Sequence, residues 1–290
     1  MRVIVIGGGG LIGHKLWQLL PKTIDDVFTT TRKAKSELQQ FHLFDSNKVI
    51  DQVDVHDFQH LEGILHAVNP DVVINCVGIT KRKEQINDPY KAIYVNALYP
   101  HLLASWVQKN QKRMIHFSTD CVFNGSIGNY NEDSLTSAED MYGRTKAMGE
   151  VRYDSCLTIR SSFIGRELEG KSELLEWFLA QNGRTIKGFH KAFYSGVSTI
   201  FMAKVVSDVI LYHSDLSGLY QLATDNPISK YDLLHVAKHA FKYDVQIEPE
   251  TEFVNINTLD GSKLQRLLGY SAPSWEVMMG ELAADEIYHI

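Results

Sequence analysis

Short apolar runs alternate with longer amphipathic stretches through the first two-thirds of the chain. The apolar runs predict strands at residues 3–6, 26–31, 48–55, 71–77, 113–118 and 157–159. The stretches between them predict helices at residues 11–20, 58–68, 90–110 and 141–153. Apolar strands that alternate with helices form a parallel sheet covered on both faces. The pattern therefore predicts an α/β protein with a Rossmann-type, doubly wound parallel sheet.

This alternation weakens after residue 164, where segments such as 183–198 lack a clear period. We expect a first domain at residues 1–164, completed by segments that return at about 195–226. Residues 165–194 and 227–290 are then expected to form a smaller C-terminal lobe. No internal repeat or low-complexity linker separates the two parts.

Composition and charge limit the kinds of molecule that this protein is expected to bind. The chain is 44% hydrophobic and 22% charged, as is usual for folded globular proteins, and its net charge is −6. A negative chain has no general attraction to nucleic acid or to anionic membranes, so we expect neither as a partner. The apolar runs are too short for a signal peptide or a membrane helix, which favours a cytoplasmic protein. Three cysteines without C-x-x-C spacing predict neither a disulfide framework nor a metal site.

The first predicted strand runs directly into a glycine-rich turn, Gly7-Gly8-Gly9-Gly10-Leu11-Ile12-Gly13. It fits both G-x-G-x-x-G and G-x-x-G-x-x-G. Glycines at these spacings allow a tight turn and a close approach of backbone to a pyrophosphate, and the helix that follows favours negative charge at its start. A glycine turn without a ligand is the alternative, but the position after the first strand favours a dinucleotide.

The residues after the second strand bear on which dinucleotide is bound. NAD-binding proteins usually carry an acidic residue there, whereas an arginine suits the 2′-phosphate of NADP. This chain has Thr31, Arg32 and Lys33. The two cations would form charge-assisted hydrogen bonds to the phosphate, helped by the threonine hydroxyls. The sequence therefore favours NADPH, with NAD as the alternative cofactor and a solvated basic loop as the alternative interpretation.

Tyr142 and Lys146 form the predicted chemical centre. Residues four apart share a helix face, so the phenol and the ammonium would point into the same space. A free tyrosine has a pKa of about 10, and a nearby cation lowers it toward a value useful for proton transfer. Thr119 ends the fifth strand, at the sheet edge where α/β proteins place active sites. These residues are predicted to interconvert a carbonyl and an alcohol; a surface pair of Tyr142 and Lys146 is the alternative.

Several segments resemble the extended short-chain dehydrogenases/reductases, and most of all their dTDP-4-dehydrorhamnose reductase group. The resemblance rests on S-T-D-C-V-F-N-G at residues 118–125, Y-N-E-D at 130–133, Y-G-R-T-K-A-M-G-E at 142–150, L-D-G-S-K-L at 259–264, and Gly269-Tyr270 with Trp275. It implies that Tyr142 is the proton donor, that Lys146 binds the cofactor ribose and activates the tyrosine, and that Thr119 orients the carbonyl.

The resemblance also implies further cofactor contacts by position. Asp54 and Val55 would lie near the adenine. Cys76, Val77 and Gly78 would lie beside the dinucleotide. Asn96 matches the asparagine that holds a structural water in the family, with a capping or surface role as the alternative.

The implied activity is NADPH-dependent reduction of a keto group on a nucleotide-activated deoxysugar, for polysaccharide precursor synthesis. Cys121 stands where the related 4,6-dehydratases have a glutamate, which disfavours dehydration. Gly196-Val197-Ser198-Thr199 departs from the group's G-x-P-T, and the loop before it, residues 188–195, is unusually rich in aromatic and basic residues. The basic loop at residues 80–83 also differs from the group's acidic one, and these departures leave the sugar open. Lys81, Arg82 and Lys83 are candidates to bind a diphosphate, with a solvated basic loop as the alternative.

Two rival functions remain at this point. One is a nucleotide-sugar epimerase that retains NAD. The other is a non-catalytic, cofactor-binding subunit of the same fold, which the intact set of Thr119, Tyr142 and Lys146 argues against. The superfamily also commonly forms homodimers through the faces of helices that correspond here to those beginning near Tyr90 and Met141.

Overall fold

The computed structural model describes residues 1–170 and 172–288. A seven-stranded sheet with the order β10-β6-β5-β4-β1-β2-β3 forms its centre, and every neighbouring pair is parallel. The strands are β1 (Arg2–Ile6), β2 (Asp26–Thr30), β3 (Val49–Ile50), β4 (Val72–Asn75), β5 (Arg113–Thr119), β6 (Cys156–Ser161) and β10 (Gly218–Gln221). The order reverses direction between β1 and β4, as in doubly wound sheets. The Rossmann-type prediction is confirmed.

Apolar side chains on both faces hold the sheet between two layers of helices. In β1, Val3 and Val5 point into one buried cluster, and Ile4 and Ile6 into another. Successive side chains of a strand point to opposite faces, which explains why β1 is apolar from Val3 to Ile6. The covering helices are α1 (Gly13–Leu19), α3 (Phe58–Val68), α4 (Pro89–Ile93), α5 (Tyr99–Lys109), α6 (Met141–Met148) and α8 (Thr199–Tyr212).

Three predicted elements differ most from the structure in extent. The strand expected at 48–55 is limited to β3, because Gln52 adopts a left-handed φ of 57° that ends the extended run. The helix expected at 90–110 contains a π-helical turn, η4 (Tyr94–Leu98), between α4 and α5. The helix expected at 141–153 stops at Met148, where the chain turns away against Asn96 at Gly149.

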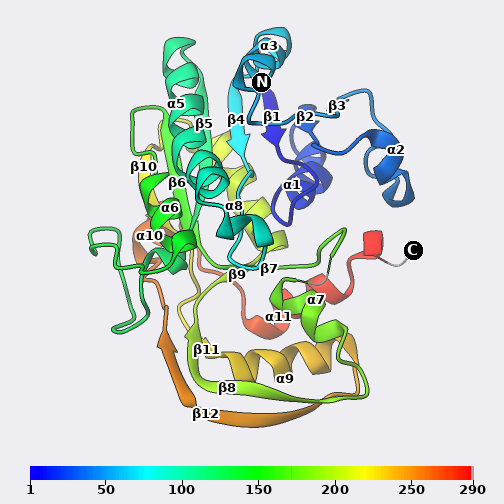
Figure 1. Cartoon of the computed structure of the whole chain (residues 1–290), viewed down its shortest axis with the longest axis vertical. Helices are drawn as coiled ribbons and strands as arrows, with labels where there is room; N and C mark the ends of the chain where they lie inside the picture. The colour runs from blue at the N-terminus through cyan, green and yellow to red at the C-terminus, as the bar shows by residue number, and fades with distance from the viewer. Residues whose placement is uncertain (171, 289–290) are drawn as a thin grey trace.

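A smaller three-stranded sheet lies apart from the main one, in the order β11-β8-β12. β8 (Thr185–Tyr194) pairs parallel with β12 (Gln246–Ile256) and antiparallel with β11 (Ile228–Ser229), and α9 (Lys230–Phe241) packs against β8. Figure 1 shows these elements grouped at the end of the molecule opposite α3 and α5. We propose the two-lobe division expected from the sequence; the return of β10 to the main sheet and the separation of β8 and β12 support it.

The remaining elements connect these parts. β7 (Phe163–Ile164) and β9 (Val197–Ser198) form a short parallel pair. The other helices are α2 (Lys35–Leu38), α7 (Leu174–Leu179), α10 (Ser262–Leu268) and α11 (Trp275–Ala283), with short turns η1 (Leu20–Lys22), η2 (Gln39–Phe41), η3 (Glu84–Asn87), η5 (Asp120–Val122) and η6 (Glu286–Tyr288). In the described part of the chain, every helix is too short or too polar to cross a bilayer.

Candidate functional site

A cavity of about 620 Å³ lies where the carboxyl ends of β1, β4, β5 and β6 meet residues from the smaller sheet. The cavity thus lies at the carboxyl edge of the sheet, at the point where the strand order reverses. Open α/β sheets bind their ligands at this place. The cavity brings together nine of the residues predicted from the sequence: Gly10, Leu11, Ile12, Cys76, Val77, Gly78, Thr119, Tyr142 and Lys146.

The glycine-rich turn is shaped so that backbone, not side chain, faces the cavity. Gly7 has a φ of 90°, a conformation that other residues rarely adopt. A Cβ atom on Gly13 would lie 2.1 Å from the carbonyl oxygen of Gly7, so only glycine fits there. Gly9 and Gly10 line the cavity beside this tight turn. The turn therefore suits the pyrophosphate of a dinucleotide, which needs close backbone approach.

Two buried amides hold the wall that follows β4. Asn75 Oδ1 accepts a hydrogen bond from Val77 N (3.0 Å), and Asn75 Nδ2 lies 3.1 Å from His116 Nδ1. Asn96 Oδ1 accepts from Ile79 N (2.8 Å), and its Nδ2 donates to Ile79 O (2.9 Å). Asn96 thus holds the backbone of Ile79, which lines the cavity, but is not itself among the lining residues.

Lys146 is buried against the end of β5. Its Nζ donates a hydrogen bond of 2.6 Å to Phe117 O. Burial lowers the pKa of Lys146 to about 8, although the neighbouring Glu150 and Cys76 act in the opposite direction. A desolvated ammonium that also lines the cavity suits the binding of ribose hydroxyls.

Tyr142 also lines the cavity, but its acidity differs from the expectation. Burial raises its pKa above the ordinary value, nearby Cys121 and Asp120 raise it further, and the Thr119 hydroxyl opposes them. The expected lowering by Lys146 was wrong, because desolvation of the phenol is the largest influence on its pKa. A raised pKa keeps the phenol protonated, as a proton donor must be.

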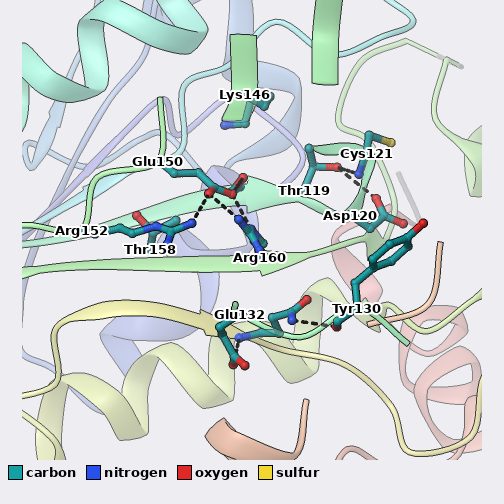
Figure 2. A network of polar contacts seen from close by, with 12 residues as sticks. Thr119, Asp120, Cys121, Tyr130, Glu132, Lys146, Glu150, Arg152, Thr158 and Arg160 are labelled. Carbon is teal, nitrogen blue, oxygen red and sulfur yellow. Dashed lines mark hydrogen bonds and ion pairs between the residues drawn. The ribbon is translucent and has the colours of Figure 1, made fainter. Parts of the chain in front are cut away.

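Thr119, the last residue of β5, is hydrogen-bonded to the two residues that follow it. Its Oγ1 donates to Asp120 Oδ1 (3.1 Å) and accepts from Cys121 N (3.1 Å), as Figure 2 shows. Burial raises the pKa of Asp120, while the charge of Lys230 acts to lower it. The hydroxyl and the acid therefore form one polar group facing the space beside Tyr142.

A buried ion pair supports this end of β5 and β6. Arg160, fully buried, donates to Glu150 through Nε (2.6 Å) and Nη2 (2.7 Å). The same carboxylate accepts hydrogen bonds from Ser118 Oγ (2.8 Å) and from Arg152 Nη2 (3.2 Å), so two strands and the segment after α6 meet on one side chain. Figure 2 shows Arg152 and Arg160 on this carboxylate. Arg160 therefore serves as a structural ion-pair partner of Glu150.

The predicted phosphate and adenine contacts lie outside the cavity lining in the described structure: Thr31, Arg32, Lys33, Asp54 and Val55. Lys33 Nζ is paired with the carboxylate of Glu169 at 2.7 Å. The threonine hydroxyls of this region are hydrogen-bonded to backbone in the described structure, and their part in holding a phosphate stays a prediction. Thr29 Oγ1 donates to Val5 O, Thr30 Oγ1 accepts from Gly7 N, and Thr31 Oγ1 donates to Lys33 O.

Part of the cavity wall comes from residues that the sequence did not single out: Lys230, Phe253, Asn255 and Asn257, with Phe193 from the aromatic segment 188–195. Burial lowers the pKa of Lys230, whereas Asp120 raises it. The predicted basic loop is present too, with Lys81 bonded to Asp140 (2.6 Å) and Arg82 bonded to Ser172 O. No local motif marks Lys230, because its partners are distant in the sequence.

The chain is similar in sequence to several curated proteins. The chain is 26% identical over 240 residues to the spore coat polysaccharide biosynthesis protein SpsK of Bacillus subtilis, covering 77% of each chain. It is 30% identical over 152 residues to the methionine adenosyltransferase 2 subunit beta of Pongo abelii, covering 51% of this chain and 41% of that protein. The chain spans about half the length of several curated relatives that it matches.

The fold is similar to that of a solved dTDP-4-dehydrorhamnose reductase from Bacillus anthracis in complex with NADP. The TM-score is 0.81 at 18% identity, over 97% of this chain and 98% of that chain. A family model described as the RmlD substrate binding domain matches residues 1–286. The chain therefore belongs to the RmlD substrate binding domain family.

Proposed function

We propose that this protein is an NADPH-dependent reductase that acts on a keto group of a nucleotide-activated deoxysugar. The observation that carries the proposal is the meeting of the glycine turn with Thr119, Tyr142 and Lys146 around one cavity. A relative named for spore coat polysaccharide biosynthesis supports a role in making polysaccharide precursors. Such reactions use metabolites of the cytoplasm, so the proposal implies a cytoplasmic location.

The residues present fit a nicotinamide dinucleotide. The open backbone of Gly10 would meet the pyrophosphate, Cys76 to Gly78 would flank the dinucleotide, and Lys146 would bind ribose hydroxyls. When bound, the reduced cofactor supplies the hydride that the keto carbon receives. Arg32 and Lys33 are proposed for the 2′-phosphate, and Asp54 and Val55 for the adenine side. Preference for NADPH over NADH follows from the two cations.

The protein's own part in the reaction is to orient the substrate and supply a proton. Thr119 Oγ1 would turn from Asp120 to hold the carbonyl oxygen, and the hydrogen bond strengthens as that oxygen gains negative charge. The Tyr142 phenol would give its proton to the oxygen as the carbon is reduced, which leaves an alcohol. Lys146 stabilises the phenolate that remains.

The test is direct. Protein and NADPH are mixed with a panel of nucleotide-linked 4-keto-6-deoxysugars, and NADPH oxidation is followed by its absorbance. Consumption of one NADPH per alcohol formed supports the proposal. An epimerase would instead retain NAD and turn over without added reductant, so a preparation with bound NAD and no NADPH consumption would contradict it.

The similarity to a methionine adenosyltransferase subunit favours one second candidate, a cofactor-binding subunit without its own reaction. The complete set of Thr119, Tyr142 and Lys146 in the cavity argues against it, because a binding module has no need of a proton donor. Tight NADPH binding without oxidation by any sugar in the panel would favour the subunit.

We also propose a homodimer. Exposed apolar side chains follow the surfaces of α4, η4 and α6: Tyr90, Ile93, Leu98, Met141 and Met148. Grouped apolar side chains of this kind mark association surfaces. Leu98→Glu with Met148→Glu should convert a dimer to a monomer in light scattering, whereas Leu135→Glu, exposed outside these helices, should not. A monomeric wild-type protein would contradict the proposal.

A further inference from the structure

Two phenylalanines of the smaller sheet line the cavity while remaining open to solvent. Phe193 is 39% exposed and Phe253 is 47% exposed. The ring of Phe189 packs on that of Phe253, with centroids 4.9 Å apart. Single exposed phenylalanines are common on protein surfaces, but two that line the same cavity offer flat apolar faces to whatever enters it.

Phe253 lies within a bulge of β12. The strand advances from Glu250 to Val254 while its partner β8 advances only from Phe189 to Lys191. The Glu250 carboxylate satisfies the backbone within the bulge, accepting hydrogen bonds from Glu252 N (2.7 Å) and from Phe253 N (3.2 Å). Bulges re-aim side chains beside binding sites, and this one is held by its own hydrogen bonds.

Two amides lie next to this aromatic pair. Asn255 and Asn257 both line the cavity, and Asn257 Oδ1 is buried without a hydrogen-bond partner among the described residues. Both side chains abut Gly125, where a Cβ would lie 2.5 Å from Asn255 Nδ2 and 2.6 Å from Asn257 Oδ1. The missing side chain at Gly125 thus makes room for the two amides side by side, and the Asn257 oxygen has no hydrogen-bond donor among the described residues.

We propose that Phe193, Phe253, Asn255 and Asn257 form the subsite for the nucleobase of the substrate, named here the base subsite. Aromatic faces that stack a base and amides that bond its edge are how proteins hold single bases. The inference rests on the proposed function, because it assumes a nucleotide-activated sugar. With the sugar beside Tyr142, the diphosphate would meet Lys230 and Arg82, whose charges both act in this part of the cavity.

The test measures nucleotide binding to protein saturated with NADPH. Thymidine diphosphate, uridine diphosphate and inorganic diphosphate are titrated by calorimetry into the wild type, Phe253→Ala, Phe253→Leu, Asn257→Ala and the control Val254→Ala. Val254 is the exposed neighbour of Phe253 and lies outside the cavity lining among the described residues. NADPH affinity reports whether each variant is folded.

The base subsite predicts that Phe253→Ala and Phe253→Leu weaken the better-bound nucleoside diphosphate roughly tenfold or more. Asn257→Ala should weaken it about fivefold. Inorganic diphosphate should bind all variants equally, and Val254→Ala should match the wild type.

Three results would overturn the base subsite. Unchanged nucleotide affinity in Phe253→Ala removes it and leaves the proposed function standing, since the wild type still binds the nucleotide. Equal losses for the nucleotide and for inorganic diphosphate show that the variant disturbs the cavity in general. A wild type that binds NADPH but neither nucleotide overturns the base subsite and the proposed function together.

Discussion

Tyr142 and Lys146 are four residues apart on α6, yet burial shifts their pKa values in opposite directions. Burial disfavours the charged form of each group, which is the phenolate of tyrosine and the ammonium of lysine. The pKa of Tyr142 therefore rises, and that of Lys146 falls to about 8. At neutral pH both residues carry their protons, which is the state that a reductase needs before hydride transfer.

Replacing Tyr142 with phenylalanine tests the proton donor. We expect turnover to fall at least 100-fold, the usual contribution of a positioned general acid, because the new side chain fills the same space without the acidic hydrogen. NADPH affinity, measured by fluorescence titration, should stay within about twofold, since the ring is kept. Near-normal turnover in this variant would remove Tyr142 from the mechanism.

The pH dependence of kcat/KM for NADPH tests Lys146. The group is protonated below its pKa of about 8 and neutral above it, so kcat/KM should decline as the pH rises through about 8. Tyr142 should add no loss in this range, because its raised pKa keeps it protonated. Lys146→Arg is the control: guanidinium does not titrate here, so a weaker but flat profile is expected. A wild-type profile that is flat to pH 9.5 would contradict this role.

At the scale of elements, the ends of β5 and β6 are tied to the residue that follows α6. Glu150 accepts hydrogen bonds from Ser118 on β5 and from Arg160 on β6. Thr119 and the Phe117 carbonyl that binds Lys146 lie on the same end of β5. The ion pair therefore ties the two strand ends to the segment that follows α6.

Glu150→Gln should lower the free energy of unfolding by roughly 3 kcal/mol, because it leaves the buried Arg160 guanidinium without its counter-charge. Urea denaturation followed by circular dichroism measures this change. Arg152→Gln is the matched control: it removes an exposed partner of the same carboxylate and should cost less than about 1 kcal/mol. Equal losses in the two variants would contradict the importance of the buried pair.

The pH dependence of the unfolding free energy provides a second test of the Glu150 interactions. Arg160 and the hydrogen bonds to Glu150 outweigh burial, so the pKa of Glu150 is lower in the folded protein than its ordinary 4.5. Its contribution is therefore present above about pH 4.5 and is lost as the pH falls below that value. The difference in unfolding free energy between wild type and Glu150→Gln should shrink over the same range.

At the scale of the whole molecule, an ion pair joins the predicted phosphate site to the segment after β7. Lys33 follows β2, and Glu169 lies on the segment after β7 and lines the cavity. A 2′-phosphate would compete with the Glu169 carboxylate for Lys33. Cofactor binding at the proposed phosphate site would therefore act on this segment through the contact between Lys33 and Glu169.

Glu169→Gln should tighten NADPH binding about two- to fivefold, the range expected for freeing a half-exposed cation from its partner. Lys33→Ala should weaken NADPH binding, because the phosphate loses a charge-assisted hydrogen bond. Fluorescence titration of both cofactors provides the check, with NADH as the internal control. If NADH responds as strongly as NADPH, Lys33 does not contact the phosphate.

The sequence by itself determined the parallel sheet, the glycine turn, and the shared cavity of Tyr142 with Thr119 and Lys146. These features are encoded within single strands, turns and helices, where side-chain period and local backbone geometry decide the structure. Only the tertiary structure decided the pairing of Lys33 with Glu169, the raised pKa of Tyr142, and the placement of Lys230 and Phe253 in the cavity wall. Those depend on burial and on contacts between segments distant along the chain, which no local pattern records.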